Sequence, residues 1–114
     1  MNDSVQGEAA GETANVAEQQ VKPDYPVKGL PNLDFYQKTY GKSCGNNDDR
    51  AGRVFKEYEN NDRIKRVKAE LIAISQSKVS PELCERIMGK TRKAKFGTWE
   101  KWAIMLINVI SSGR

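Results

Sequence analysis

The chain has 114 residues, with 19 lysines and arginines, 15 aspartates and glutamates, and no histidine. This length allows one ordinary domain and leaves little room for a large internal substrate cavity. Histidine is the commonest general base and the usual partner of a serine or cysteine nucleophile, so its absence argues against an enzyme. We expect a non-catalytic protein without a cofactor.

Residues 1–29 differ in composition from the rest of the chain. They are rich in glutamine, glutamate, alanine and glycine, contain Pro23 and Pro26, and include only one aromatic residue, Tyr25. Such a segment lacks the apolar area that would offset the entropy lost on ordering. The sequence therefore predicts a disordered acidic tail over residues 1–29 and a helical domain over residues 30–114.

The first predicted helix follows Pro31. Asn32 stands at a capping position, and Leu33, Tyr36 and Tyr40 recur with helical spacing until a glycine ends the pattern. The next few residues, which include a Gly-Asn-Asn run, are expected to form a loop.

Two helices are expected next, near residues 48–59 and 62–77, with Asn47-Asp48-Asp49 supplying caps and negative charge to the first. The apolar positions are Ala51, Val54, Phe55 and Tyr58 in the first helix and Ile64, Val67, Leu71 and Ile74 in the second. The two sets do not share a face, because the six residues from Tyr58 to Ile64 are not a whole number of turns. We expect a break there, with Asp62 capping the second helix; one long bent helix is the alternative.

The last two predicted helices span Ser80–Gly89 and Thr98–Ser111, with Ser80 and Thr98 as their caps. The Ser80-Pro81 pair is typical of a helix start, and the apolar face that follows is Leu83, Cys84, Ile87 and Met88. The predicted core face of the final helix is Trp99, Trp102, Ala103, Leu106, Val109 and Ile110, whereas Ile104 falls on the exposed stripe. No convincing strand pattern occurs. The predicted fold class is all-α, a single small domain of about five helices around one core.

The sequence matches neither a structural zinc site nor a phosphate-binding P-loop. The two cysteines, Cys44 and Cys84, supply too few ligands for a structural zinc site in a chain without histidine, although the sequence leaves a disulfide between them open. Gly89-Lys90-Thr91 matches only the end of a phosphate-binding P-loop, because the required earlier glycine is Cys84 and the preceding element is a helix.

The location of the protein follows from what its sequence lacks. The N-terminus shows no charged-then-apolar secretory pattern, and the longest uninterrupted apolar run, Trp102 to Ile107, is far shorter than the roughly 20 residues of a membrane span. We expect an intracellular protein, cytoplasmic or associated with the nucleoid or nucleus, with no membrane partner.

Charge is divided unevenly along the chain. Residues 1–49 carry four cations against eight carboxylates, a net charge of −4, whereas residues 50–114 carry 15 cations against seven carboxylates, a net charge of +8. A basic domain with an acidic tail is typical of proteins that meet polyanions. The alternative is that the uneven distribution has no functional meaning in a chain so rich in charged residues.

Two basic sets are the candidate sites. The first, on the third predicted helix, is Arg63, Lys65, Arg66 and Lys68. Its members do not form one stripe, and Arg66 can pair with Asp62 or Glu70, so a solvated helix face is the stronger interpretation. The second is Arg86, Lys90, Arg92, Lys93 and Lys95. No carboxylate lies between Glu85 and Glu100, and the segment Gly89–Thr98 is expected to be a loop that leaves these cations exposed.

These residues predict a small protein that binds DNA or RNA through phosphates, largely independently of sequence, in an accessory or architectural role. Phe96 and Trp99 stand beside the cations, where stacking on unpaired bases would favour single strands. The burial expected for Trp99 and Trp102 leaves Phe96 as the candidate. A helix-turn-helix is disfavoured, because the connection before Thr98 is too long and the last helix too apolar for a groove.

An assembly subunit of a complex or viral particle, without nucleic-acid specificity, is the alternative function. Its basis is the small core and the exposed apolar Ile104. A further hypothesis is that the acidic tail masks the basic segment through charge complementarity. The sequence leaves open the protein partner and the oligomeric state.

Overall fold

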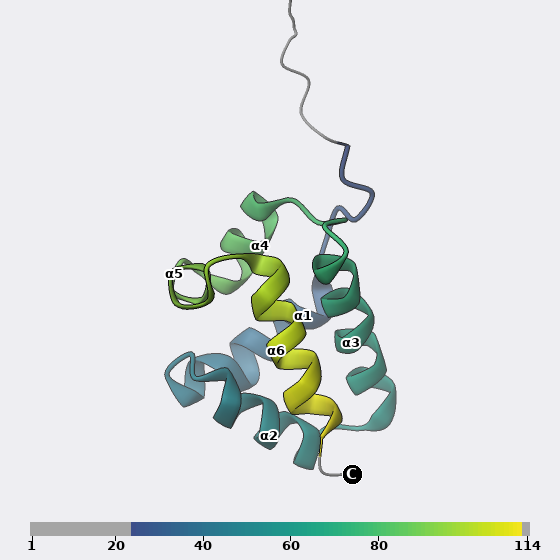
Figure 1. The fold of residues 1–114 in the computed structure, drawn as a ribbon. Helices are drawn as coiled ribbons and strands as arrows, with labels where there is room; N and C mark the ends of the chain where they lie inside the picture. The colour runs from purple at the N-terminus through teal and green to yellow at the C-terminus, as the bar shows by residue number, and fades with distance from the viewer. Residues whose placement is uncertain (1–23, 113–114) are drawn as a thin grey trace, which may run out of the picture.

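The computed structural model describes residues 24–112, in which six α-helices and two short helical turns share one core (Figure 1). In chain order these are α1 (Pro31–Tyr36), the π-helical turn η1 (Gln37–Gly41), the 3-10 turn η2 (Lys42–Cys44), α2 (Asp48–Tyr58), α3 (Asn61–Ser75), α4 (Pro81–Met88), α5 (Thr91–Phe96) and α6 (Trp99–Ser111). The part of the chain that is described contains no β-strand, so the all-α prediction is confirmed.

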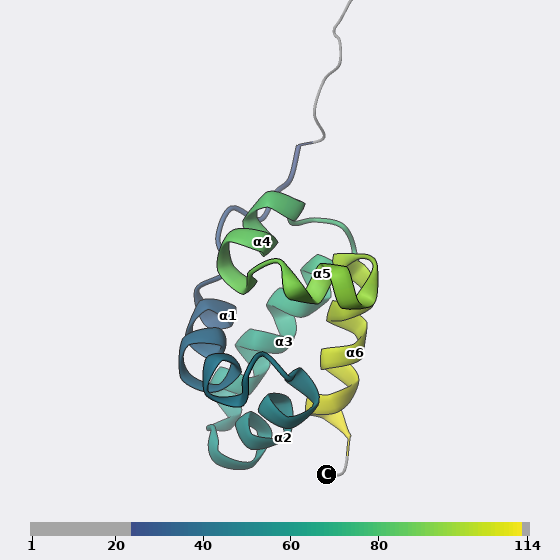
Figure 2. The same ribbon diagram turned by 90° about the vertical axis from the view of Figure 1, so that its left-hand side faces the viewer.

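Helix α6 is the element around which the others assemble. It packs against α3, α2 and α5, while α4 and α5 lie together at one end of the molecule and α2 at the other (Figures 1 and 2). Its core face is as predicted: Trp99, Trp102, Ala103, Leu106 and Ile110 are buried, and Val109 is half-buried. Ile104 is 51% exposed, also as predicted.

The predicted break between the second and third helices is confirmed, since α2 ends at Tyr58 and α3 begins at Asn61. The cap was assigned to the wrong residue, because the side chain of Asn60, not of Asp62, accepts from the Arg63 amide at 2.8 Å. Tyr58, which was predicted on the apolar face of this helix, does not reach the core. It is the last residue of α2 and is 78% exposed.

The start of α1 is stabilised from a distance. Asn32 was expected to cap it, but the helix begins one residue earlier and Asn32 lies inside its first turn. The carboxylate of Glu70 on α3 instead accepts from the backbone amides of Asn32 at 3.0 Å and Leu33 at 2.7 Å. These amides have no partner within the helix, so a charged acceptor there stabilises both the helix start and the packing of α1 on α3.

The boundary of the N-terminal segment also differs from the prediction. Residues 1–23 of the predicted disordered tail lie outside the described part of the chain. Val27, also assigned to that tail, packs against the core and forms an isolated parallel bridge with Val79, its amide donating to the Lys78 carbonyl at 3.2 Å. None of the helices between residues 24 and 112 combines the length and the apolar character that crossing a membrane requires.

Candidate nucleic-acid interface

The second basic set lies on a helical corner rather than on a loop. Helix α4 ends at Met88 and is followed by Gly89, whose φ of +86° is a conformation that glycine adopts without strain. The chain then enters α5, so the prediction of a loop over Gly89–Thr98 is wrong for most of that segment. Four exposed cations, Arg86, Lys90, Lys93 and Lys95, occupy this turn, which we call the α4–α5 corner (Figure 2).

Arg92 does not belong to this exposed group. Its side chain is only 2% exposed, and its Nε and Nη2 atoms donate to the two carboxylate oxygens of Asp48, each at 2.8 Å. Its Nη1 atom donates to the Met88 carbonyl at 2.6 Å. The prediction that Arg92 contacts phosphate is therefore wrong, because a buried guanidinium with a bidentate carboxylate partner cannot reach a ligand in solvent.

The carboxylate of Asp48, at the start of α2, connects this helix to three other helices. Besides Arg92 on α5, it accepts from the Tyr36 hydroxyl on α1 and from the Trp102 indole on α6, both at 2.7 Å. Burial raises the pKa of Tyr36 above its ordinary value, and the neighbouring Asp48 carboxylate raises it further, so the hydroxyl remains a donor. Four donors thus satisfy the two buried oxygens, and the network fixes α5 against the rest of the core.

The cations of the α4–α5 corner are not paired in this way. Within residues 24–112, Arg86, Lys90 and Lys93 make no ion pair, and Lys95 makes only a cation–π contact, with its Nζ atom 5.5 Å from the centroid of the Phe96 ring. Two carboxylates, Glu82 and Glu85, line a hollow together with Arg86 and Lys90. Lys93 and Lys95 on α5 are therefore the least compensated positive charges of the corner.

Two of the four residues in the first basic set, Arg63 and Arg66, already interact with neighbouring side chains. Arg66 pairs with Asp62 at 2.9 Å, one of its two predicted partners, whereas Glu70 serves α1 instead. Arg63 lies over the ring of Phe35, 3.8 Å from its centroid, and its Nε atom is 3.7 Å from the Glu59 carboxylate. Lys65 is exposed and Lys68 half-buried, and neither makes an ion pair within the described residues. This set does not join the α4–α5 corner.

Lys42 was missed by the sequence analysis because it lies in the acidic half of the chain. It lines a groove with Arg86 and Gly89, which brings η2 alongside the end of α4. The groove also contains Asp34, but this carboxylate pairs with Lys38 at 3.1 Å. Lys42 is exposed and makes no ion pair among the described residues, so it extends the basic surface beyond the corner.

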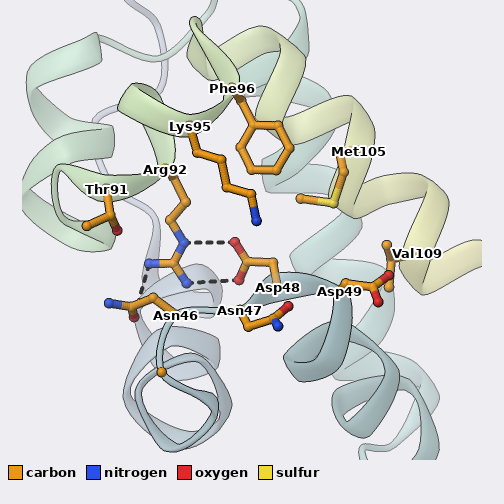
Figure 3. A pocket seen from close by; sticks show the side chains of 11 residues that line it. Asn46, Asn47, Asp48, Asp49, Thr91, Arg92, Lys95, Phe96, Met105 and Val109 are labelled. Carbon is orange, nitrogen blue, oxygen red and sulfur yellow. Dashed lines mark hydrogen bonds and ion pairs between the residues drawn. The ribbon is translucent and has the colours of Figure 1, made fainter.

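A pocket of about 470 Å³ opens beside α5 (Figure 3). Its walls come from the segment between η2 and α2, from the first residues of α2, and from α5 and α6, and Phe96 and Lys95 both point into it. Phe96 is half-buried, whereas Trp99 is 4% exposed, which removes Trp99 as a candidate for stacking. Phe96 was predicted from the sequence, whereas the run from Asn46 to Asp49 was predicted only to form a turn and a helix cap.

The cysteines play no part in this surface. Cys44 and Cys84 are both free thiols, which answers the question that the sequence left open. Burial raises the pKa of Cys84 to about 12, so this thiol is protonated and inert at neutral pH. Comparisons of the chain with models of protein families, with curated proteins and with solved structures gave no match. The functional interpretation therefore depends on the geometry described above.

Proposed function

We propose that the chain binds nucleic acid through phosphate contacts made by the α4–α5 corner, with Lys42 contributing from η2, in an accessory rather than a catalytic role. One observation carries this proposal. Four exposed cations occupy ten residues of a helical corner, and none of them is ion-paired within residues 24–112. The corner is also held in place, because the buried Arg92–Asp48 pair anchors α5 beneath the exposed lysines.

Phosphate is the ligand that suits such a surface. Lysine side chains neutralise backbone phosphates and release condensed counterions, which gives affinity with little dependence on base sequence. Because Glu82 and Glu85 weaken the field near Arg86 and Lys90, we expect the strongest phosphate contacts at Lys93, Lys95 and Lys42. About three to five phosphates would then be neutralised, and for a single strand the slope of log K against log salt would be roughly −2 to −3.5.

Fluorescence anisotropy with a labelled oligonucleotide at several salt concentrations tests the proposal. The test variant changes all four corner cations to glutamine: Arg86→Gln, Lys90→Gln, Lys93→Gln and Lys95→Gln. A matched control removes four cations that lie outside the corner and are already ion-paired with aspartates: Lys28→Gln, Lys38→Gln, Arg53→Gln and Arg66→Gln. Circular dichroism establishes that both variants keep their helices.

The corner variant should lose most of its affinity and most of its salt dependence, whereas the control should retain both. Equal losses in the two variants would show that net charge, not the corner, attracts the polyanion. A wild-type affinity that does not change with salt would refute phosphate binding altogether.

The alternative role in assembly finds less support. Ile72 on α3 and Ile104 on α6 are 44% and 51% exposed. Scattered exposed apolar side chains of this kind are normal on protein surfaces and do not by themselves mark an interface. We therefore do not propose an assembly function.

A further inference from the structure

The pocket beside α5 has one apolar wall. Phe96 on α5 stands near Met105 and Val109 on α6, and these three side chains line the same side of the cavity (Figure 3). At about 470 Å³, the cavity falls within the range of sites that hold small organic ligands or parts of larger ones. A flat aromatic ring beside a polarizable methionine favours a flat ligand.

The opposite wall supplies hydrogen-bond donors. The Asn46 side-chain oxygen accepts from Gln37 at 2.9 Å and from Arg92 at 3.4 Å. Because arginine can only donate, these contacts fix the orientation of the Asn46 amide and leave its NH2 group without a protein partner in the described chain. The Asn47 side-chain oxygen accepts from the Arg50 amide at 3.3 Å. The NH2 group of Asn47 therefore also has no protein partner in the described chain. A ligand with hydrogen-bond acceptors on its edge therefore suits this wall.

Among the charged residues that line the pocket, one lysine has no ion-pair partner in the described chain. Asp48 is neutralised by Arg92, and Asp49 pairs with Arg53 at 3.4 Å. Lys95 has no carboxylate partner within the described residues and points into the pocket (Figure 3). It also belongs to the α4–α5 corner, so an anionic group bound at Lys95 lies between the pocket and the other lysines of the corner.

We propose that this pocket receives one unpaired base of a single-stranded nucleic acid. The base stacks on Phe96, a carbonyl or ring-nitrogen acceptor on its edge faces the Asn47 amide, and its phosphate binds Lys95. A base within a duplex is stacked on its neighbours and paired with the opposite strand, so it cannot enter a pocket between helices unless it is first flipped out of the duplex. This inference depends on the proposed function and specifies its substrate class as single strands.

The test compares two single strands that carry the same phosphates. One is an oligothymidylate of about 12 nucleotides, and the other is an abasic strand of the same length, so that both present the same charge. The full-length chain should bind the thymidylate strand about five- to fiftyfold more tightly than the abasic strand, as expected for one stacked base. Phe96→Leu keeps apolar volume but removes the flat ring, and it should abolish this preference without changing the affinity for the abasic strand.

Phe96→Tyr is the matched variant, because it keeps the ring, and its preference should stay within about twofold of the wild type. A methyl NMR signal from Met105 reports on the pocket directly, and the signal from Met88, which is 1% exposed in the core, serves as the internal reference. The thymidylate strand should shift the Met105 signal and leave Met88 unchanged. The abasic strand should shift neither.

The outcomes separate this inference from the proposed function. Equal, salt-dependent affinity of the wild type for both strands would overturn the base pocket and leave phosphate binding intact. Binding of neither strand would overturn both. If thymidine 5′-monophosphate saturates the Met105 shift at the same concentration as the strand, the ligand is a free nucleotide and the assignment to single strands is wrong.

Discussion

At the scale of single residues, Asp48 determines what Arg92 does. The carboxylate is 4% exposed and accepts four hydrogen bonds, two of them from Arg92 in bidentate geometry. Removing one partner of such a pair leaves an uncompensated buried charge, which costs about 3–5 kcal/mol. Arg92 is therefore a structural residue, although Lys93, the next residue in the sequence, is proposed to bind phosphate.

Separate substitutions of Arg92 and its neighbour Lys93 should have different effects: the first should lower stability, and the second should weaken phosphate binding. Arg92→Lys keeps the charge but cannot reproduce the two parallel bonds to Asp48, so the free energy of unfolding should fall by about 2–4 kcal/mol. The salt slope of nucleic-acid binding should not change. Lys93→Met should change the free energy of unfolding by less than about 0.5 kcal/mol, yet reduce the salt slope by roughly 0.7–0.9.

Urea denaturation followed by circular dichroism measures the first quantity, and anisotropy at several salt concentrations measures the second. If Arg92→Lys lowers the salt slope as much as Lys93→Met does, Arg92 contacts phosphate and its assignment as a structural residue is wrong.

The error over Arg92 shows where reasoning from the sequence ends. Within the sequence, the nearest carboxylates to Arg92 are Glu85 and Glu100, so the residue was counted as unneutralised. Its partner stands 44 positions earlier, in a run whose polar character was already explained by helix capping. A pair between distant positions leaves no local pattern, and only the fold reveals it.

At the scale of helices, most local cap signals were reliable, although Asn32 and Asp62 were assigned wrongly, and contacts between distant positions were not predicted. Asn47, Ser80 and Thr98 were predicted as caps, and each accepts from the amide three residues later, since capping is a local interaction. Helix α5 was missed because it is only six residues long and its anchor, Arg92, is not apolar. The acceptor at the start of α1 was missed because Glu70 comes from another helix.

The contact between α2 and α6 depends on Gly52. A Cβ atom built at this position would lie 2.8 Å from Cγ1 of Val109 and 2.9 Å from Cδ1 of Leu106. The Leu106 methyl ends a flexible side chain, but the branched Val109 side chain is stiff on its helix. The absence of a side chain at Gly52 therefore permits the close approach of the two helices.

Gly52→Ala should lower the free energy of unfolding by about 1–2 kcal/mol, because the steric cost exceeds the roughly 1 kcal/mol that alanine gains inside a helix. In a Val109→Ala background the main obstacle is gone, and the same change should become neutral or stabilising. Urea denaturation of the four proteins of this cycle measures the difference. A stabilising Gly52→Ala in the wild-type background would contradict the close contact.

At the scale of the whole molecule, the charge is divided between two parts of the chain. Residues 24–112 contain 17 cations and 11 carboxylates, a net charge of +6, whereas residues 1–23 contain one lysine and four carboxylates, a net charge of −3. The acidic segment is covalently attached to the basic one, so any competition that it offers to phosphate would act at a high effective concentration. This division supports the hypothesis that the N-terminal segment weakens polyanion binding.

Neutralising that segment in the full-length chain tests the hypothesis. The variant carries Asp3→Asn, Glu8→Gln, Glu12→Gln and Glu18→Gln, and we expect it to bind an oligonucleotide at least about threefold more tightly at low salt, with the gain fading as salt screens the charges. A control with Asp24→Asn, Asp34→Asn, Asp49→Asn and Asp62→Asn changes the net charge equally, but removes carboxylates that pair with Lys28, Lys38, Arg53 and Arg66. If both variants gain equally, the overall field of the protein is responsible. Masking of the α4–α5 corner requires a larger gain from the N-terminal changes, because only those changes remove the carboxylates proposed to compete with phosphate for the corner lysines.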